Sequence, residues 1–171
     1  MQKSIPQIVL PRLIEQFSAT LACLILLLVG QTGCGDQKTY FGFSKTDFVV
    51  VEEEDDHGGF LGDGVYRLIL DCAENREQAL EKLGTWRELP LSEDLELMMY
   101  GGMRDGTHYY GSHLEGLLPE IENGWYCFRD RHHESTDSAD DSGLLERGSF
   151  NFSLAVYDAD TDQLYVIELD T

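Results

Sequence analysis

The order of apolar and polar residues along the chain predicts mainly β-strands. Five segments are rich in β-branched and aromatic residues or alternate between apolar and polar positions, which is typical of strands: residues 47–54, 65–72, 124–130, 150–158 and 164–169. In the fourth segment, Phe152, Leu154 and Val156 fall on one face. A polar turn, ADTDQ, separates the last two segments and predicts a hairpin.

Residues 74–84 carry the periodicity of a helix. Ala79, Leu80 and Leu83 gather on one stripe, while the charged residues between them face away. Gly84 follows as a stop signal. The pattern predicts a short amphipathic helix.

Residues 91–102 (LSEDLELMMYGG) fit two structures. Leu95, Leu97 and Met99 alternate as the apolar residues of a strand do, whereas Ser92 followed by acids is typical of a helix cap. We expect a strand here.

Together these elements predict an α+β fold. We expect a mainly antiparallel sheet of about five strands, near the usual sheet size, built from hairpins. The one short amphipathic helix would pack on this sheet. A doubly wound parallel sheet is excluded, because it needs a helix between successive strands.

The chain is strongly acidic. It has 32 Asp and Glu residues against 12 Lys and Arg, which gives a net charge of −20. Nucleic-acid binding is excluded on this ground, because affinity for a phosphate backbone depends on Lys and Arg. A cationic protein partner fits this charge.

The first 33 residues differ from the rest and predict a signal peptide. Residues 21–30 (LACLILLLVG) form an apolar run, preceded by the bases Lys3 and Arg12. About ten apolar residues suit a secretory signal, whereas a membrane-spanning helix needs about 20. We therefore expect residues 1–33 to be removed, with an uncleaved membrane anchor as the alternative.

The sequence that follows resembles the lipobox of bacterial lipoproteins, in which small residues precede a cysteine that is cleaved and acylated. Thr32 and Gly33 precede Cys34, although Gln31 stands where the family prefers leucine. The resemblance implies that Cys34 carries lipid and attaches the chain to the cell membrane. Residues 34–46 would then be a polar tether and residues 47–171 a single extracytoplasmic domain. Cleavage without acylation, giving a secreted protein, is the other outcome.

Several phrases of the domain also look like those of small bacterial proteins with such a leader. These are HGGFLGDG, IENGWYCF, DRHHESTD and YDADTDQLY. The resemblance carries no activity and no functional residue.

Two cysteines belong to the predicted domain, Cys72 and Cys127. Outside the cytoplasm they could form one disulfide, and the alternative is a pair of buried thiols. Their spacing does not fit a C-x-x-C redox or zinc motif.

Two polar loops contain candidate metal ligands. His57 stands beside Asp56 in the glycine-rich loop 55–64, and His132, His133 and Glu134 belong to the loop 131–143. If the loops met at one edge of the sheet, a divalent metal such as zinc could bind there. The alternative is a glycine-eased bend and a solvated acidic loop.

Other motifs of catalysis or cofactor binding do not fit the chain. Gly59 and Gly64 have P-loop spacing, but the lysine of that motif is missing. The stretch 158–169 opens like a calcium loop, but Gln163 and Leu169 replace its glycine and glutamate. We therefore expect a membrane-anchored acidic binding or interaction lipoprotein that needs no cofactor and is not an enzyme. The alternatives are a metal-dependent enzyme using His57 with His132 or His133, and an acidic inhibitor of a cationic partner.

Overall fold

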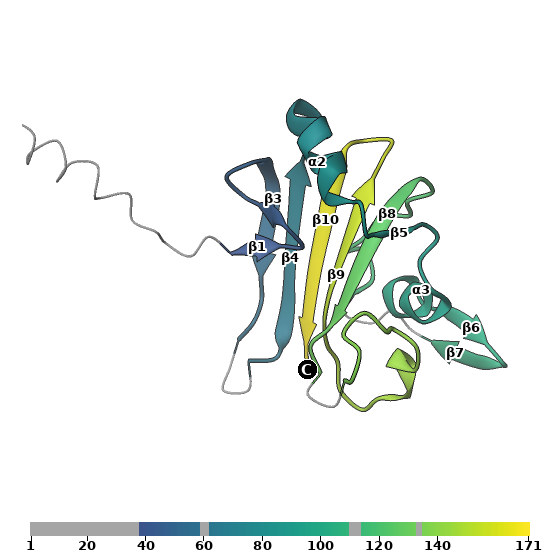
Figure 1. The fold of residues 1–171 in the computed structure, drawn as a ribbon. Coiled ribbons are helices and arrows are strands. Elements are labelled where there is room, and N and C mark those ends of the chain that lie inside the picture. The colour runs from purple at the N-terminus through teal and green to yellow at the C-terminus, as the bar shows by residue number, and fades with distance from the viewer. Residues whose placement is uncertain (1–37, 59–61, 110–113, 133–134) are drawn as a thin grey trace, which may run out of the picture. The chain divides into compact units, whose positions relative to one another are not determined.

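A six-stranded sheet organises the chain in the computed structural model, which describes residues 38–58, 62–109, 114–132 and 135–171 (Figure 1). Every pair of neighbouring strands in it is antiparallel. The strands, in their order across the sheet, are β3 (Val49–Asp55), β4 (Gly64–Asp71), β10 (Gln163–Asp170), β9 (Asn151–Asp158), β8 (Gly124–Asp130) and β5 (Arg87–Glu88). The predicted α+β class is confirmed, and the hairpin strands lie where the sequence predicted them.

The hairpin of β9 and β10 forms the centre of the sheet. The two strands pair along their whole length, from Asp158 opposite Gln163 to Asn151 opposite Asp170. Seven consecutive residues of β9, Phe152–Asp158, are buried. Since successive side chains of a strand point to opposite faces, both faces of the sheet must be covered.

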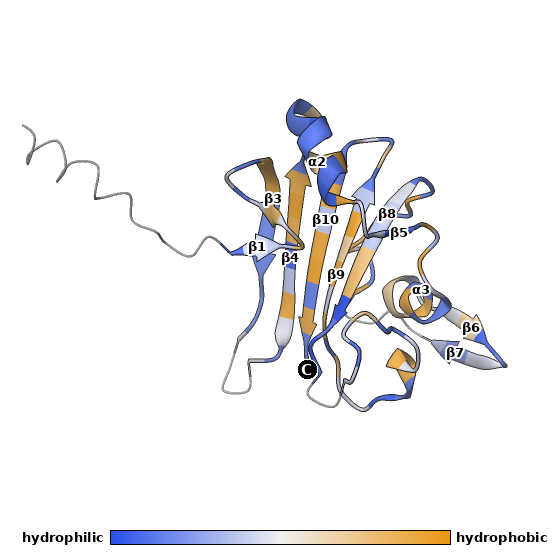
Figure 2. Cartoon of the chain, viewed as in Figure 1, coloured by the Kyte–Doolittle hydropathy of each residue, from blue (hydrophilic) through white to orange (hydrophobic). Residues whose placement is uncertain are grey.

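One face is covered by the helix α3 (Glu93–Tyr100), by the short 3-10 helix η3 (Leu144–Glu146) and by residues 114–121. Leu95 and Met99 of α3 pack in one core cluster with residues of four strands. These strand residues include Ile69, Tyr126, Phe128, Phe152, Leu154, Val156, Tyr165, Ile167 and Leu169. Figure 2 shows the apolar residues of the central strands between the more polar outer elements.

The other face is covered by the N-terminal hairpin and by the helix that the sequence predicted. This helix is α2 (Arg76–Lys82), and the 3-10 turn η1 (Ala73–Asn75) leads into it. Ala79 of α2 and Leu83 after it join the second core cluster. The sheet contributes Tyr66, Leu68, Leu70, Ala155, Tyr157, Leu164 and Val166 to this cluster, and Cys72, which follows β4, joins them.

The folded unit begins earlier than the sequence indicated. Residues 38–46, assigned to a polar tether, contain the hairpin of β1 (Thr39–Tyr40) and β2 (Phe43–Ser44). Tyr40 and Phe43 are buried in the second core cluster. The compact unit therefore starts at Lys38 and not at residue 47.

The strand predicted at residues 91–102 is wrong, because this segment forms α3. Ser92 caps the helix by accepting a hydrogen bond from the N–H of Leu95, and acids fill the first turn, where the helix dipole favours them. Gly101, with φ 72°, ends it. Leu97 is also buried, although it does not belong to the core cluster of Leu95 and Met99, so burial on more than one side of the helix produced the alternation that resembled a strand.

After α3 the chain forms a small separate hairpin of β6 (Gly102–Arg104) and β7 (Thr107–Tyr109). Arg104 makes an ion pair with the buried Asp94 of α3 and stacks on Tyr109, so the hairpin is tied to the helix.

Among the residues that the structure describes, no helix has the length and apolar character needed to cross a bilayer.

Gly124 is required where β8 begins. It has φ +155°, and a Cβ atom there would lie 1.9 Å from the carbonyl oxygen of Tyr157. Its own carbonyl accepts a hydrogen bond from the N–H of Leu89, at 3.1 Å. The glycine thus lets β8 approach β9 and holds the chain that leads from β5 to α3.

Substitution of Gly124 by alanine should therefore destabilise the fold, because the new methyl group collides with backbone. We expect the free energy of unfolding in urea to fall by about 2 kcal/mol or more. Gly148→Ala is the matched control, since a Cβ atom there meets nothing within 4 Å, and its effect should stay within about 0.5 kcal/mol. Equal stabilities of the two variants would contradict this account of β8.

Candidate functional site

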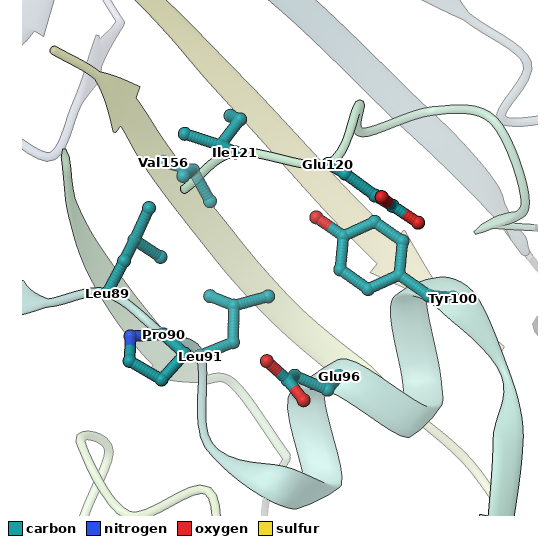
Figure 3. A pocket seen from close by; sticks show the side chains of 8 residues that line it. All are labelled: Leu89, Pro90, Leu91, Glu96, Tyr100, Glu120, Ile121 and Val156. Atoms are coloured by element: carbon teal, nitrogen blue, oxygen red, sulfur yellow. The ribbon is translucent and has the colours of Figure 1, made fainter. Parts of the chain in front are cut away.

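A pocket of about 250 Å³ lies between α3 and the sheet (Figure 3). Four separate parts of the chain build it: the connection from β5 to α3, the exposed side of α3, the end of the segment 114–121, and β9. The lining residues are Leu89, Pro90, Leu91, Glu96, Tyr100, Glu120, Ile121 and Val156.

The pocket combines an apolar interior with acidic groups. Val156 of β9 and Leu91 are buried at its base, and Ile121 is half-buried. Glu96 and Glu120 are exposed, and both carboxylates reach the pocket beside the ring of Tyr100 (Figure 3). An apolar base with a few polar groups is the usual composition of a ligand site.

The pKa of Tyr100 is raised in this pocket, in part by the two acids. Its hydroxyl donates a hydrogen bond to the carbonyl oxygen of Pro119, at 3.0 Å. Burial, followed by the charges of Glu120 and Glu96, raises the pKa of the Tyr100 hydroxyl to about 12. The two carboxylates therefore act on the same point, and a positive group placed there would be stabilised by both.

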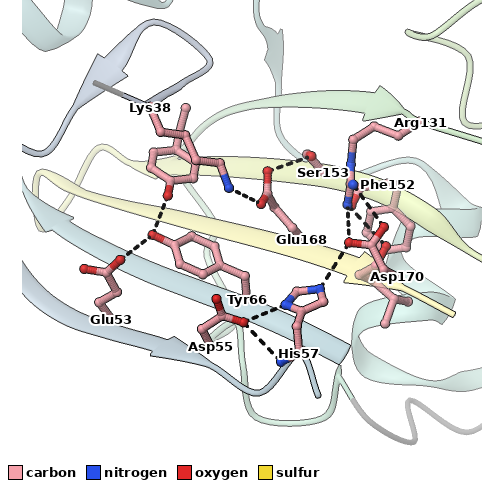
Figure 4. A network of polar contacts seen from close by, with 12 residues as sticks. Lys38, Glu53, Asp55, His57, Tyr66, Arg131, Phe152, Ser153, Glu168 and Asp170 are labelled. Carbon is pink, nitrogen blue, oxygen red and sulfur yellow. Dashed lines mark hydrogen bonds and ion pairs between the residues drawn. The ribbon is translucent and has the colours of Figure 1, made fainter. Parts of the chain in front are cut away.

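A second polar cluster, here called the His57 cluster, consists of His57, Asp55, Asp170 and Arg131 (Figure 4). His57 contacts Asp55 through Nδ1, at 2.7 Å, and Asp170 at the end of β10 through Nε2, at 3.1 Å. Burial by itself lowers the pKa of His57, but the hydrogen bonds and charges of Asp55 and Asp170 outweigh it and raise that pKa above its ordinary 6.5.

Arg131 holds Asp170 from the opposite side. Its Nη1 lies 2.9 Å from one carboxylate oxygen of Asp170, and its Nη2 lies 3.1 Å from the other. Nη2 also donates to the carbonyl oxygen of Phe152, at 2.9 Å. This two-point geometry is the strong form of an arginine–carboxylate pair. It joins the start of the loop 131–143 to the end of the sheet.

The contacts of the His57 cluster show where the two candidate metal loops lie relative to each other. They do meet at one end of the sheet, since His57 and Arg131 both contact Asp170. Both ring nitrogens of His57 face carboxylates, and this arrangement suits an imidazolium cation, whereas a metal ligand needs a free nitrogen lone pair. Within the described residues, no group of three or more His, Cys, Asp or Glu side chains is arranged to hold a metal.

The other predicted metal ligands contact other groups or lie outside the described residues. Asp56 accepts a hydrogen bond from the N–H of Val65, which closes the bend between β3 and β4. The Nε2 atom of His132 lies 3.4 Å from the hydroxyl oxygen of Ser149. His133 and Glu134 are outside the described residues, as is Cys34. A metal at these loops stays a prediction.

Cys72 and Cys127 are both free cysteines in the structure. Cys72 follows β4 and Cys127 lies on β8, and β10 and β9 separate these strands. Three strand spacings of about 4.8 Å amount to about 14 Å, and a disulfide needs Cα atoms within about 7 Å. Of the two alternatives that the sequence left open, the structure therefore has free thiols and not the disulfide. Burial raises the pKa of the Cys72 thiol to about 12, as expected for an inert thiol.

No local pattern in the sequence marks the residues that line the pocket beside α3, called the α3 pocket from here on. Glu96 and Tyr100 are four positions apart on α3, but the segment was expected to be a strand, which would have placed them differently. Glu120 and Ile121 come from a stretch without a regular pattern. Only the three-dimensional arrangement brings these side chains together.

In comparisons with known proteins, no family model matches the chain, and no curated protein or solved structure is significantly similar to it.

The raised pKa of His57 predicts a defined pH dependence of stability. A group whose pKa is higher in the folded state stabilises that state at acidic pH, and the contribution is lost as the pH rises through the folded pKa. The free energy of unfolding of the wild type minus that of His57→Gln should therefore be largest at acidic pH and fall as the pH rises above 6.5 through the raised pKa of His57.

The pKa itself can be measured by NMR titration of the His57 ring. We expect a value above 6.5 that drops in Asp170→Asn, which removes one of the two carboxylates. Asp63→Asn, an exposed acid of the same loop, is the control and should leave the value nearly unchanged. A His57 pKa at or below 6.5 would contradict the cluster.

Proposed function

We propose that this chain is an acidic binding module, attached outside the cytoplasmic membrane, whose α3 pocket accepts a basic side chain of a partner protein. The observation that carries the proposal is the composition of the pocket. Its lining contains two acids, an apolar base and no Lys or Arg. An inhibitor of a cationic partner would use the same contact.

The size of the pocket fits one side chain. Pockets for drug-sized ligands have volumes of about 300–1,000 Å³, and this one has about 250 Å³. The aliphatic stem of Lys or Arg would lie on Leu91, Ile121 and Val156, while its charged end stays near solvent. Glu96 and Glu120 would pair with that end.

The charge of the whole chain supports the same partner. A net charge of −20 creates a negative potential that attracts cationic proteins and speeds their association. The two acids of the pocket then select the basic side chain at short range. The net charge would therefore speed the encounter, and the two acids of the pocket would then provide specificity.

Attachment to the membrane through Cys34 belongs to this proposal. The apolar run 21–30 and the lipobox-like sequence QTGC support it. The mass of the mature protein isolated from bacterial membranes should equal that of a chain starting at Cys34 plus acyl groups. Cys34→Ser should remain unprocessed. A mature chain that retains residues 1–33 would contradict cleavage.

Binding of n-butylammonium, which reproduces the side chain of lysine, tests the α3 pocket. Titration of the full chain, followed by methyl NMR, should shift Leu91, Ile121 and Val156. Methylammonium lacks three methylene groups and should bind about fiftyfold more weakly, at about 0.8 kcal/mol per buried methylene. Butanoate, with the opposite charge, should not bind.

The double variant Glu96→Gln/Glu120→Gln should weaken n-butylammonium binding by about tenfold or more, because it removes both carboxylates and leaves the shape unchanged. Glu77→Gln/Glu81→Gln on α2 changes the net charge equally at exposed positions and is the control. It should leave the affinity within about twofold, since distant exposed charges act only through screened fields. Equal losses in both variants would refute a specific pocket.

A further inference from the structure

The edge strand β3 is open along one side. It pairs with β4, and in the described part of the chain no strand pairs with its other side. Every residue of β3 except Glu52 is exposed. The opposite edge, β5, is only two residues long. An exposed strand of this length presents unpaired N–H and C=O groups, to which another extended segment can add.

The first half of β3 exposes three consecutive valines. Val49, Val50 and Val51 are 56%, 40% and 53% exposed, and they account for three of the five exposed large hydrophobic residues in the described chain. A β-bulge falls between Val50 and Glu52, so Val51 has no register partner on β4. Figure 2 shows this apolar half beside the hydrophilic half of the strand. Contiguous exposed apolar residues indicate an interaction site.

The second half of β3 is acidic on both faces. Glu52, Glu53, Glu54 and Asp55 follow one another without interruption. Because successive side chains of a strand alternate, Glu52 and Glu54 lie on one face and Glu53 and Asp55 on the other. A neighbouring strand with consecutive basic residues would therefore meet an acid at each position, on either face.

Three of these acids already have partners inside the chain. Glu52 pairs with Arg67, Glu53 pairs with Lys45, and Asp55 pairs with His57. A carboxylate has about four acceptor positions, so each of these acids retains capacity for a further donor. The internal pairs fix the acids along the edge, where an added strand would meet them.

We propose that β3 docks an extended basic segment of a partner protein as an added antiparallel strand. All pairings of the six-stranded sheet are antiparallel, and this geometry is the slightly more stable one. A second copy of this chain is disfavoured, because each copy carries a charge of −20 and the acidic half of the strand would face its own kind. The inference does not rest on the α3 pocket.

Antiparallel addition fixes the order of residues in the partner. The start of the added strand lies opposite Asp55 and its end lies opposite Val49. The partner segment must therefore carry basic residues first and β-branched residues afterwards. A segment of the reverse order would place its basic residues against the valines.

The backbone of β3 also fixes which amides can pair. The N–H of Asp56 donates to the carbonyl oxygen of Val65 on β4, at 3.1 Å. Alternate residues direct their N–H groups to opposite sides, so the N–H groups of Glu53 and Asp55 point to the open edge. In an added strand, every second amide would face β3 and the others would face solvent.

The peptide acetyl-Lys-Lys-Lys-Lys-Val-Thr-Val-amide, labelled with a fluorophore, tests the proposal by fluorescence anisotropy with the full chain. We expect saturable binding that is at least fivefold tighter than that of the reversed sequence Val-Thr-Val-Lys-Lys-Lys-Lys. The two peptides have the same charge. Equal affinities would mean unspecific charge attraction and would overturn the proposal.

Two N-methylated forms of this peptide separate strand addition from other contacts. One form is methylated at the odd-numbered amides and the other at the even-numbered amides, which leaves the charge unchanged. One form should lose at least tenfold in affinity, because its methyl groups face β3, and the other should stay within threefold of the parent. Equal behaviour of the two forms would overturn the proposal.

Val49→Lys and Met103→Lys are matched variants of the protein. Each replaces an exposed apolar residue by lysine, at 56% and 69% exposure, so the change in net charge is the same. Val49→Lys should weaken the peptide at least fivefold, and Met103→Lys, on β6, by less than twofold. The protein should sediment as a monomer. A dimer that Val49→Lys disperses would identify a second copy as the occupant and would overturn the proposal. Peptide binding that appears only after removal of residues 1–37 would also overturn it.

Discussion

Burial of the β9–β10 hairpin on both faces is the constraint on which the rest of the structure depends. An antiparallel sheet can leave one face in water, but seven consecutive buried residues of β9 require two covering layers. The chain supplies one layer from α3 and its neighbours, and the other from β1, β2 and α2. Both layers are assembled from short elements, because most of the long regular segments of the sequence form strands of the sheet.

The two proposed binding surfaces lie where this covering ends. The α3 pocket lies where the covering layer meets β9 and the connection from β5, so its base is part of the core while its acids reach solvent. β3 extends beyond both core clusters, and none of its residues belongs to either. A rigid centre with open groups at its margin suits binding, because little order has to be created when a partner arrives.

The sequence predicted five of the six strands, which are rich in β-branched and aromatic residues, and it predicted α2, which buries one stripe. It did not predict β5, which has only two residues. It failed at α3, where Leu95, Leu97 and Met99 are all buried and the helical period is hidden. It also failed at residues 38–46, where a polar composition concealed the core residues Tyr40 and Phe43. The meeting of His57 with Asp170, 113 positions apart, depends on strand order, which local patterns do not encode.

The central claim is that acidic groups at the margin of a rigid sheet bind basic partners without disturbing its centre. Amide hydrogen exchange of the full chain, with and without the peptide acetyl-Lys-Lys-Lys-Lys-Val-Thr-Val-amide, tests this claim most directly. The account predicts the slowest exchange in β9 and β10 in both states, and new protection concentrated in β3. Protection spread evenly over the acidic surface, or a change confined to β9 and β10, would contradict it.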